Sequence, residues 1–280
     1  MGVEIDARRQ TGLRPVRGFS LPVFASAGLE ARAGALAARV VRARDFLAAT
    51  LGAEAAVALL VLGPEDWPGR SHHPVYGMPN CAGGNLIVAG VPNPFWQGFV
   101  DLVAAAAPTQ EAALRAAYPP GGGGAAGADG ALDLSPFFDL LAVHELAHVF
   151  LQQAPFGFPR RWLTEFFGNL CLHAYVAAAE PAALPQLTAF PAAVAAVDPA
   201  AVPHHSLAAF EALYEDVGPL AYGWYQCRLH AAARRVYDAG GVAALRRLWD
   251  AYAVPDARLA ATLTRDVHPT VAAILETWPG

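Results

Sequence analysis

The spacing of apolar residues divides the chain into a region that predicts strands and a longer region that predicts helices. Short apolar runs bounded by Gly and Pro are typical of buried strands, and three occur, at 18–27, 55–62 and 84–90. Apolar residues at helical spacing alternate with them, at 29–51, 95–107 and 109–118. The stretch 65–80 is rich in Pro and Gly and is predicted to be a loop.

From Ser135 onward the pattern is almost wholly helical. Ser135 followed by Pro136 has the residue types of a helix N-cap and first turn. Pro155 and Gly157 are predicted to end that helix near Gln153. Further helices are predicted at 160–179, 206–215, 219–239, 242–252 and 269–277.

These elements predict an α+β fold with three parts. They are a loosely held arm over 1–17, a small α/β sheet subdomain over 18–130 and a mainly helical part over 131–280. A Gly-rich stretch at 119–130 ends the subdomain and is predicted to be a flexible loop. The two larger parts are expected to form one catalytic unit.

Composition and charge exclude several classes of protein. With 55% hydrophobic and 15% charged residues, the chain is globular rather than disordered. A formal net charge of -5 indicates no basic surface for nucleic acid. All 19 basic residues are Arg, which excludes a catalytic lysine. No signal segment or membrane-spanning run is recognised and the three Cys are far apart, so we expect a cytoplasmic protein.

One short motif carries chemistry. In His144-Glu145-Leu146-Ala147-His148 the two His are one helical turn apart and lie on one face. Both imidazoles can therefore bind one metal ion, and Glu145 can reach a water molecule beside it. This is the His-Glu-x-x-His pattern of zinc peptidases, with the Glu as general base. The alternative is a pair of core His hydrogen-bonded to backbone, and Glu145 favours the metal.

Catalytic zinc needs three protein ligands and an open position. Glu165 is predicted to be the third ligand, because it lies 17 residues after His148, early in the next helix. A helix, a turn and an antiparallel helix would return it to the metal. The metzincin pattern needs Gly three and His six residues after the second His, where this chain has Leu151 and Ala154.

The two segments together resemble the gluzincins, zinc metallopeptidases of the MA clan, and most of all their aminopeptidase N-like branch. In that branch the Glu ligand lies in a Trp-Leu-Asn-Glu-Gly segment about nineteen residues after the second His. Here the segment is Trp162-Leu163-Thr164-Glu165-Phe166, two residues closer. The resemblance covers about residues 135–180. It implies a zincin-like fold and one Zn²⁺ ion bound by His144, His148 and Glu165, with Glu145 as the base.

The same resemblance assigns an oxyanion donor. The family has a Tyr about sixty residues after the ligand Glu, and Tyr225 lies at that offset from Glu165. Tyr222 is a rival, and for either residue the alternative is a buried ring that only packs. Asn169, one turn after Glu165, is predicted to hold the ring of a ligand His.

A substrate-binding region is predicted upstream of the motif. Gly77-Met78-Pro79-Asn80 resembles the Gly-x-Met-Glu-Asn loop with which aminopeptidases bind the substrate amine. Pro79 replaces the acid, which argues against aminopeptidase specificity. The strand at 84–90 could pair with an extended peptide, and Asn80, Gly84 and Asn85 are predicted to contact it.

The sequence therefore predicts a zinc-dependent metallopeptidase-like hydrolase that acts on a peptide or protein and has no nucleic-acid or membrane partner. Two alternatives stay open: an inactive, zinc-stabilised module that binds peptide or protein, and a zinc hydrolase of a non-peptide bond. Two other His sites are less expected to be functional. His204-His205 is predicted to be a loop pair rather than an oxyanion donor, and His173 a core or ligand-supporting group.

Overall fold

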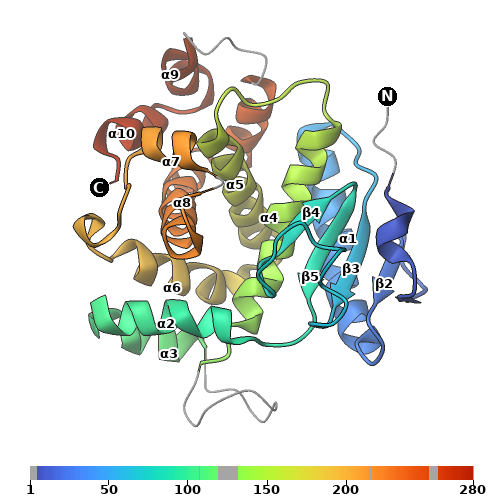
Figure 1. Cartoon of the computed structure of the whole chain (residues 1–280). Helices are drawn as coiled ribbons and strands as arrows, with labels where there is room; N and C mark the ends of the chain where they lie inside the picture. The colour runs from blue at the N-terminus through green and yellow to red at the C-terminus, as the bar shows by residue number, and fades with distance from the viewer. Residues whose placement is uncertain (1–4, 107, 119–131, 215, 252–257, 280) are drawn as a thin grey trace. The chain divides into compact units, whose positions relative to one another are not determined.

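The computed structural model describes residues 5–106, 108–118, 132–214, 216–251 and 258–279 (Figure 1). The chain divides into two compact units, Met1–Gly98 with Tyr118–Ala154 and Phe99–Ala117 with Pro155–Gly280. This division differs from the boundary predicted at residue 131, because the motif helix belongs to the first unit. The Gly-rich stretch predicted at 119–130 lies outside the described residues.

The first unit is built on a mixed five-stranded sheet with the order β1-β2-β3-β5-β4. Its strands are β1 (Arg14–Pro15), β2 (Val23–Ala25), β3 (Ala58–Leu62), β4 (Asn80–Ala82) and β5 (Asn85–Ala89). The pairs β2–β3 and β3–β5 are parallel, and the outer pairs β1–β2 and β4–β5 are antiparallel. Every residue of β3 and β5 is buried, as their continuous apolar runs predict. A mixed sheet with a mostly helical remainder agrees with the predicted α+β class.

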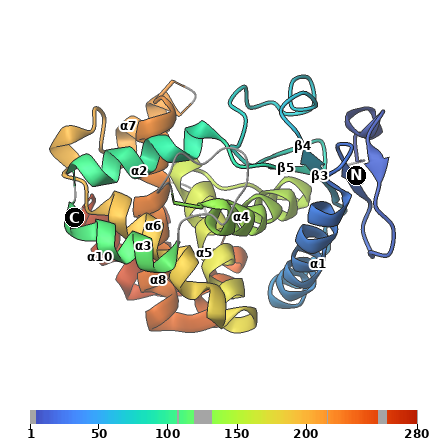
Figure 2. The same ribbon diagram turned by 90° about the horizontal axis from the view of Figure 1, so that it is seen from below.

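Two helices cover one side of this sheet (Figure 2). Helix α1 (Glu30–Leu51) contacts β2 and β3, whereas α4 (Ser135–Gln153) contacts β4 and β5, and the helices also contact each other. The buried residues of α1 recur three or four positions apart, which is the stripe of an amphipathic helix. The predicted bounds of α4 are confirmed. Its predicted cap is wrong: the Ser135 N–H donates to Asp133 Oδ1 at 2.9 Å, and Ser135 is already the first helical residue.

The described part of the N-terminal segment is not loosely held. The Asp6 N–H donates to the Gly83 carbonyl at 2.8 Å, and Asn85 Nδ2 donates to the Asp6 carbonyl at 3.1 Å. Further along, β1 pairs with β2, and η1 (Ala7–Gln10) forms a short 3₁₀ helix. Backbone pairing therefore joins the segment from Asp6 onward to the sheet, where the sequence predicted a loosely held arm.

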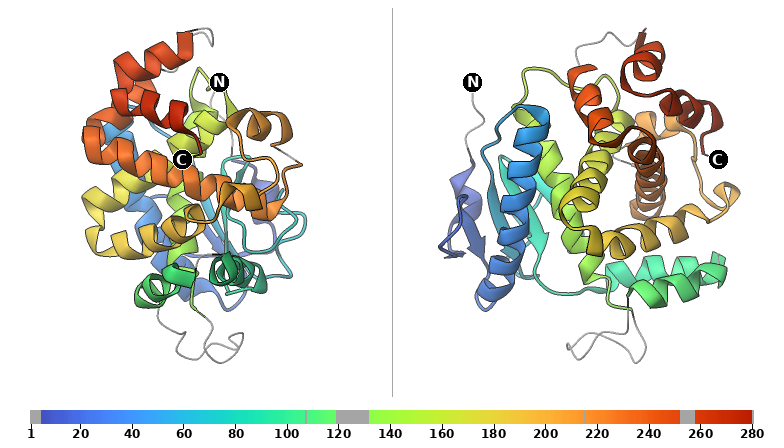
Figure 3. Two further views of the ribbon diagram at one scale, coloured as in Figure 1. Left: turned by 90° about the vertical axis from the view of Figure 1, so that its left-hand side faces the viewer. Right: turned by 180° about the vertical axis from the view of Figure 1, so that it is seen from behind.

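The second unit is helical. Its helices are α2 (Pro94–Ala106, which begins in the first unit), α3 (Glu111–Ala117), α5 (Arg161–Ala179), α6 (Leu184–Ala195), α7 (Leu207–Leu213), α8 (Pro219–Asp250), α9 (Leu259–Thr262) and α10 (Pro269–Thr277). Short 3₁₀ or π turns lie at Pro108–Gln110, Pro181–Ala183, Pro199–Ala201 and Leu263–Val267. Helix α8 packs along α5 and α6 (Figure 3). None of the helices in the described ranges is long and apolar enough to cross a membrane.

The helices depart from the sequence prediction at two places. Helix α6 is not predicted, because Pro191 interrupts its pattern, yet Pro191 lies buried inside the helix. Helix α8 joins two predicted helices across a kink at Gly241, where φ is 59° and ψ is -159°. Glycine adopts this conformation without the steric penalty that a side chain would bring.

All three cysteines are free and buried. Cys81 lies on β4 in the first unit, whereas Cys171 on α5 and Cys227 on α8 lie in the second. Burial raises the pKa of the Cys171 and Cys227 thiols, because a thiolate in an apolar interior loses its hydration.

Candidate metal centre

The motif helix α4 is fixed near its N-terminal end. The ring of Phe138 stacks on Trp96, with centroids 4.2 Å apart and planes 8° from parallel. One residue on, Asp139 Oδ1 is 2.5 Å from Arg32 Nη2 on α1. Burial raises the pKa of Asp139 although Arg32 acts in the opposite direction. The start of the helix is thus tied both to an aromatic partner and to α1.

The other end of α4 is tied to the sheet region. The side-chain amide of Gln153 accepts from the Ala56 N–H at 2.9 Å and donates to the Ala56 carbonyl at 2.7 Å. Gln152 Nε2 lies 3.2 Å from Cys81 Sγ on β4. With both ends held, the turn that carries the motif has a fixed backbone.

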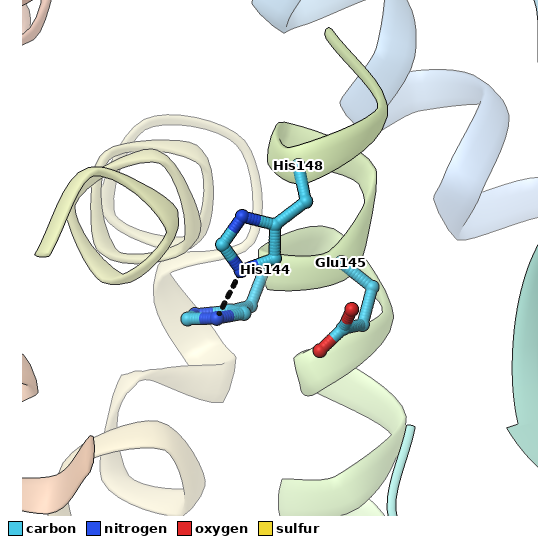
Figure 4. A group of neighbouring side chains, drawn as sticks. All are labelled: His144, Glu145 and His148. Atoms are coloured by element: carbon cyan, nitrogen blue, oxygen red, sulfur yellow. Dashed lines mark hydrogen bonds between the residues drawn. The ribbon is translucent and has the colours of Figure 1, made fainter. Parts of the chain in front are cut away.

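The motif side chains converge on one point (Figure 4). The Nε2 atoms of His144 and His148 are 2.9 Å apart, and the rings lie at 78° to each other. One ligand atom from each of His144, Glu145 and His148 lies within 4.8 Å of the others. His144 is only 5% exposed, and Glu145 is half-buried. Across the described part of the chain this is the one such group of three potential metal ligands.

The donor set fits a metal ion. Zinc binds imidazole nitrogen at about 2.0–2.1 Å in a tetrahedral arrangement, so two ligand nitrogens would be about 3.3 Å apart. The observed 2.9 Å needs only a small rotation of either ring to reach that value. The group could therefore hold a metal ion, as the spacing in the sequence predicts.

No protein-family model, no curated protein and no solved structure matches this chain. The side chains themselves are therefore the basis of any assignment. The buried His-Glu-x-x-His group supports the part of the gluzincin resemblance that concerns the motif.

Glu165, the predicted third ligand, lies on α5 in the second unit, whose position relative to the first is not determined. The residue is 2% exposed. Oε1 accepts from the Tyr214 hydroxyl and Oε2 from Gln226 Nε2, each at 2.5 Å. The ligand role of Glu165 stays a prediction.

Asn169 lies one turn after Glu165, as predicted, and is 3% exposed. Its Nδ2 donates to the Glu165 carbonyl and to Gln226 Oε1, both at 2.9 Å. The Asn169 side chain therefore binds Gln226, the residue that also donates to the Glu165 carboxylate, and all three lie in the second unit. The predicted contact with a ligand His ring stays a prediction.

The two predicted oxyanion donors differ in their surroundings. Tyr225 is fully buried, and its hydroxyl is directed at the backbone carbonyls of His204 and Ser206, the latter at 2.8 Å. Burial raises its pKa to about 12. Tyr222 is half-buried, and its ring lies 5.9 Å from that of Tyr214. The Tyr225 hydroxyl therefore donates to the backbone.

The predicted substrate residues lie at the β4–β5 hairpin. Gly83 and Gly84 form its two-residue turn, with φ of 54° and 72°, the values of a type I′ turn. Asn85 is fully buried and bonded to the carbonyls of Asp6, Ala82 and Gly83 and to Gln10 Nε2. Asn80 is 4% exposed, donates to Ser71 Oγ at 2.9 Å, and its Oδ1 has no hydrogen-bond partner in the described structure.

The strand predicted to receive a peptide is not available. Strand β5 (predicted as 84–90) pairs with β3 on one side and β4 on the other, so both of its edges are already bonded. The edge strand is β4, whose first residue, Asn80, ends the predicted loop and whose other two residues are assigned to no element. Three residues are too few for a periodic pattern, so the sequence carried no strand signal there.

The remaining His residues form no comparable centre within the described residues. His173 is 3% exposed and packs against the rings of His230 and Tyr237, as a core residue does. His204 is exposed with a φ of 58°, and His205 Nδ1 is 3.3 Å from the Val202 carbonyl. Their predicted place, a loop before a helix capped by Ser206, is confirmed.

Sequence reasoning missed the partners of Glu165, which are Tyr214 and Gln226. A signal for one of them exists: polar residues recur every four positions on α5 (Glu165, Asn169, His173) and on α8 (Gln226, His230). Such stripes on two apolar helices indicate facing polar contacts. Tyr214 follows a short helix and gives no comparable signal.

Proposed function

We propose that this protein is a zinc-dependent hydrolase of the gluzincin type that cleaves peptide bonds. The observation that supports this most strongly is the convergence of the two imidazole Nε2 atoms beside the Glu145 carboxylate (Figure 4). A purely structural zinc site is closed by four ligands and has no use for an adjacent base. The presence of Glu145 therefore favours an enzyme.

In this proposal His144 and His148 hold the ion, and Glu165 is the third ligand on the strength of the sequence resemblance. A zinc ion supplies Lewis-acid chemistry, which polarises a carbonyl group and makes a water molecule more acidic. The buried position of His144 keeps competing water away from that side of the site.

Glu145 is the proposed general base. Its half-buried carboxylate accepts a proton from the attacking water and passes it to the leaving amine. A tyrosine hydroxyl is proposed to stabilise the oxyanion. Tyr225 and its rival Tyr222 are the two candidates, and the Tyr225 hydroxyl would have to give up its hydrogen bonds to backbone carbonyls to take this role.

The proposed substrate site is the edge of the sheet. Strand β4 lies at the edge of the described sheet and contacts the motif helix α4. An extended peptide can add to such an edge through main-chain hydrogen bonds.

The test combines metal analysis with digestion of a peptide library. Wild-type protein is expected to contain about one zinc ion and to cleave peptides. Glu145→Gln should keep the zinc and lose about 10²–10⁴-fold in kcat/KM, because only the proton transfer is removed. Glu54→Gln, at an exposed position in the same unit, is the matched control and should behave as wild type.

Each negative result has a distinct meaning. Zinc bound without cleavage by the wild type would reject the peptidase and favour a zinc-stabilised binding module. Protein without zinc under non-chelating conditions would reject the metal site itself. Full activity of Glu145→Gln would remove Glu145 from the mechanism.

A further inference from the structure

The segment 76–80 leads the chain into the edge strand β4 and is anchored to the rest of the sheet. The Tyr76 hydroxyl donates to the Leu62 carbonyl at 3.0 Å, at the end of β3. The same hydroxyl accepts from the Val91 N–H at 3.2 Å, just beyond the end of β5. The entry to the edge strand is therefore tied to the two inner strands beside it.

Trp96 binds the same segment from another direction. Its Nε1 donates to the Gly77 carbonyl at 2.9 Å, and its ring stacks on Phe138 with centroids 4.2 Å apart. Phe138 lies on the motif helix α4, six residues before His144. Trp96 is 4% exposed, and a buried indole N–H usually requires an acceptor. One buried side chain therefore connects the entry of β4 with the helix that carries the candidate metal ligands.

The close approach at this point depends on glycine. Gly77 has a φ of 104°, which side chains rarely adopt, and a Cβ there would overlap the side-chain amide of Asn93. Asn93 Oδ1 accepts from the Phe95 N–H at 3.1 Å, at the first turn of α2. That turn also carries Trp96. All of these residues belong to the first unit, so the arrangement does not depend on the second.

We propose that Trp96 is a positioning residue that holds the edge strand β4 beside the motif helix for peptide binding. This inference rests on the proposed function, in which an extended peptide adds to β4. Strand β4 has three residues, Asn80–Ala82, and so short a strand is held by few ladder hydrogen bonds. Its position is therefore sensitive to contacts from outside the sheet. Trp96 supplies such a contact and joins it to α4 through Phe138.

The test compares Trp96→Phe with Phe138→Leu. The first variant deletes the indole N–H and keeps an aromatic ring, whereas the second deletes the stacked ring and keeps the N–H. Zinc content should stay at the wild-type level, because neither variant changes a proposed ligand. For a peptide that the wild type cleaves, KM should rise about tenfold and kcat should change less than about twofold, because a displaced edge weakens binding in the ground and transition states alike.

A second measurement does not require activity. Amide hydrogen exchange, resolved by peptide mass spectrometry, should become faster over residues 77–82 in both variants, because exchange there requires local opening of the edge. If Trp96→Phe does not fold, Phe138→Leu tests the inference by the same two measurements.

The chain offers a matched control in the same unit. Trp67 is 2% exposed, and its Nε1 donates to the His73 carbonyl at 2.8 Å, so Trp67→Phe deletes the same kind of bond. The ring contact of Trp67 is with Tyr76 rather than with α4. Trp67→Phe should lower the thermal midpoint as Trp96→Phe does and speed exchange near His73. It should leave KM and the exchange of residues 77–82 unchanged.

The outcomes separate this inference from the proposed function. If the wild type cleaves peptides and both test variants keep KM within about twofold of Trp67→Phe, the positioning role is overturned and the proposed function stands. Exchange over 77–82 that matches Trp67→Phe would also overturn it, because Trp96 would then not hold β4. If the wild type cleaves no peptide, the proposed function fails and the positioning role fails with it. Higher KM and faster exchange in Trp96→Phe and Phe138→Leu alone is the expected result.

Discussion

Two pairs of histidines with buried members lie in different units of this protein. His144 and His148 share helix α4, with ring centroids 4.7 Å apart and planes at 78°. His173 on α5 and His230 on α8 have centroids 5.5 Å apart and planes at 67°. Judged by ring distance and angle, the two pairs are similar, yet they support different interpretations.

The difference lies in the groups that surround the rings. In the first pair the two Nε2 atoms approach to 2.9 Å beside a carboxylate, in a group that could hold a metal ion. In the second pair the ring of Tyr237 lies 5.2 Å from that of His173, and within the described residues no carboxylate joins the two rings in a group of possible metal ligands. Convergent lone pairs, rather than buried histidines as such, indicate a ligand-binding centre.

The largest expected effect tests the first pair. His148→Ala removes one of the proposed ligand nitrogens and should lower zinc affinity roughly 1,000-fold, which corresponds to about 4 kcal/mol. His173→Leu, at the other pair, should leave zinc affinity unchanged. Both affinities can be measured by chelator competition. Equal losses in the two variants would show that the pairs are not distinct.

The next effect concerns acid stability and the second pair. Burial lowers the pKa of His173 from 6.5 to about 4, because the protonated ring loses its hydration. The unfolded chain therefore takes up the proton first as the pH falls. The free energy of unfolding should be independent of this group above pH 6.5 and decrease between pH 6.5 and 4, by about 3 kcal/mol in total.

The measurement is urea unfolding of the wild type and of His173→Leu across this pH range. The variant should lose most of the acid dependence. His204→Asn, at an exposed position whose positive φ suits Asn, should keep it. An unchanged acid dependence in His173→Leu would mean that His173 is not the titrating group.

The smallest expected effect concerns the two charged residues that shift the pKa of His173. Asp238 raises the pKa of His173 and Arg234 lowers it, each by charge. Asp238→Asn should therefore extend the acid destabilisation to lower pH, whereas Arg234→Gln should end it at higher pH. Both side chains are more than half exposed, so each change is expected to be a few tenths of a kcal/mol. NMR titration of the His173 ring would detect it, and shifts of the same sign would contradict the assignment.

The long elements could be predicted from the sequence because their patterns span several turns or a whole strand. Helix α4 matches its predicted bounds, and β3 and β5 lie within the predicted apolar runs. Strand β4 could not be predicted, since three residues show no period. Helix α6 was missed because Pro191 is tolerated where the surrounding packing holds the helix.

The part of the candidate site that could be predicted is the part whose residues are close together in the sequence. The motif histidines are four residues apart on one helix, so helical geometry alone brings them together. The surroundings of Glu165 depend on Tyr214 and Gln226, which follow it by 49 and 61 residues. Their contacts depend on how three helices pack, which no spacing in the chain encodes. The same applies to Tyr225, whose hydroxyl is bonded to a loop.

Each unit contains at least one buried cysteine, so the reactivity of its thiols can report local opening of that unit. A thiol with almost no exposed surface reacts with a maleimide only when the surrounding structure opens. Modification of Cys81 would report opening around the edge strand β4, and modification of Cys171 and Cys227 would report separation of helices α5 and α8. Maleimide labelling followed by peptide mass spectrometry could therefore measure the rate of local opening in each unit separately, with the natural cysteines as probes.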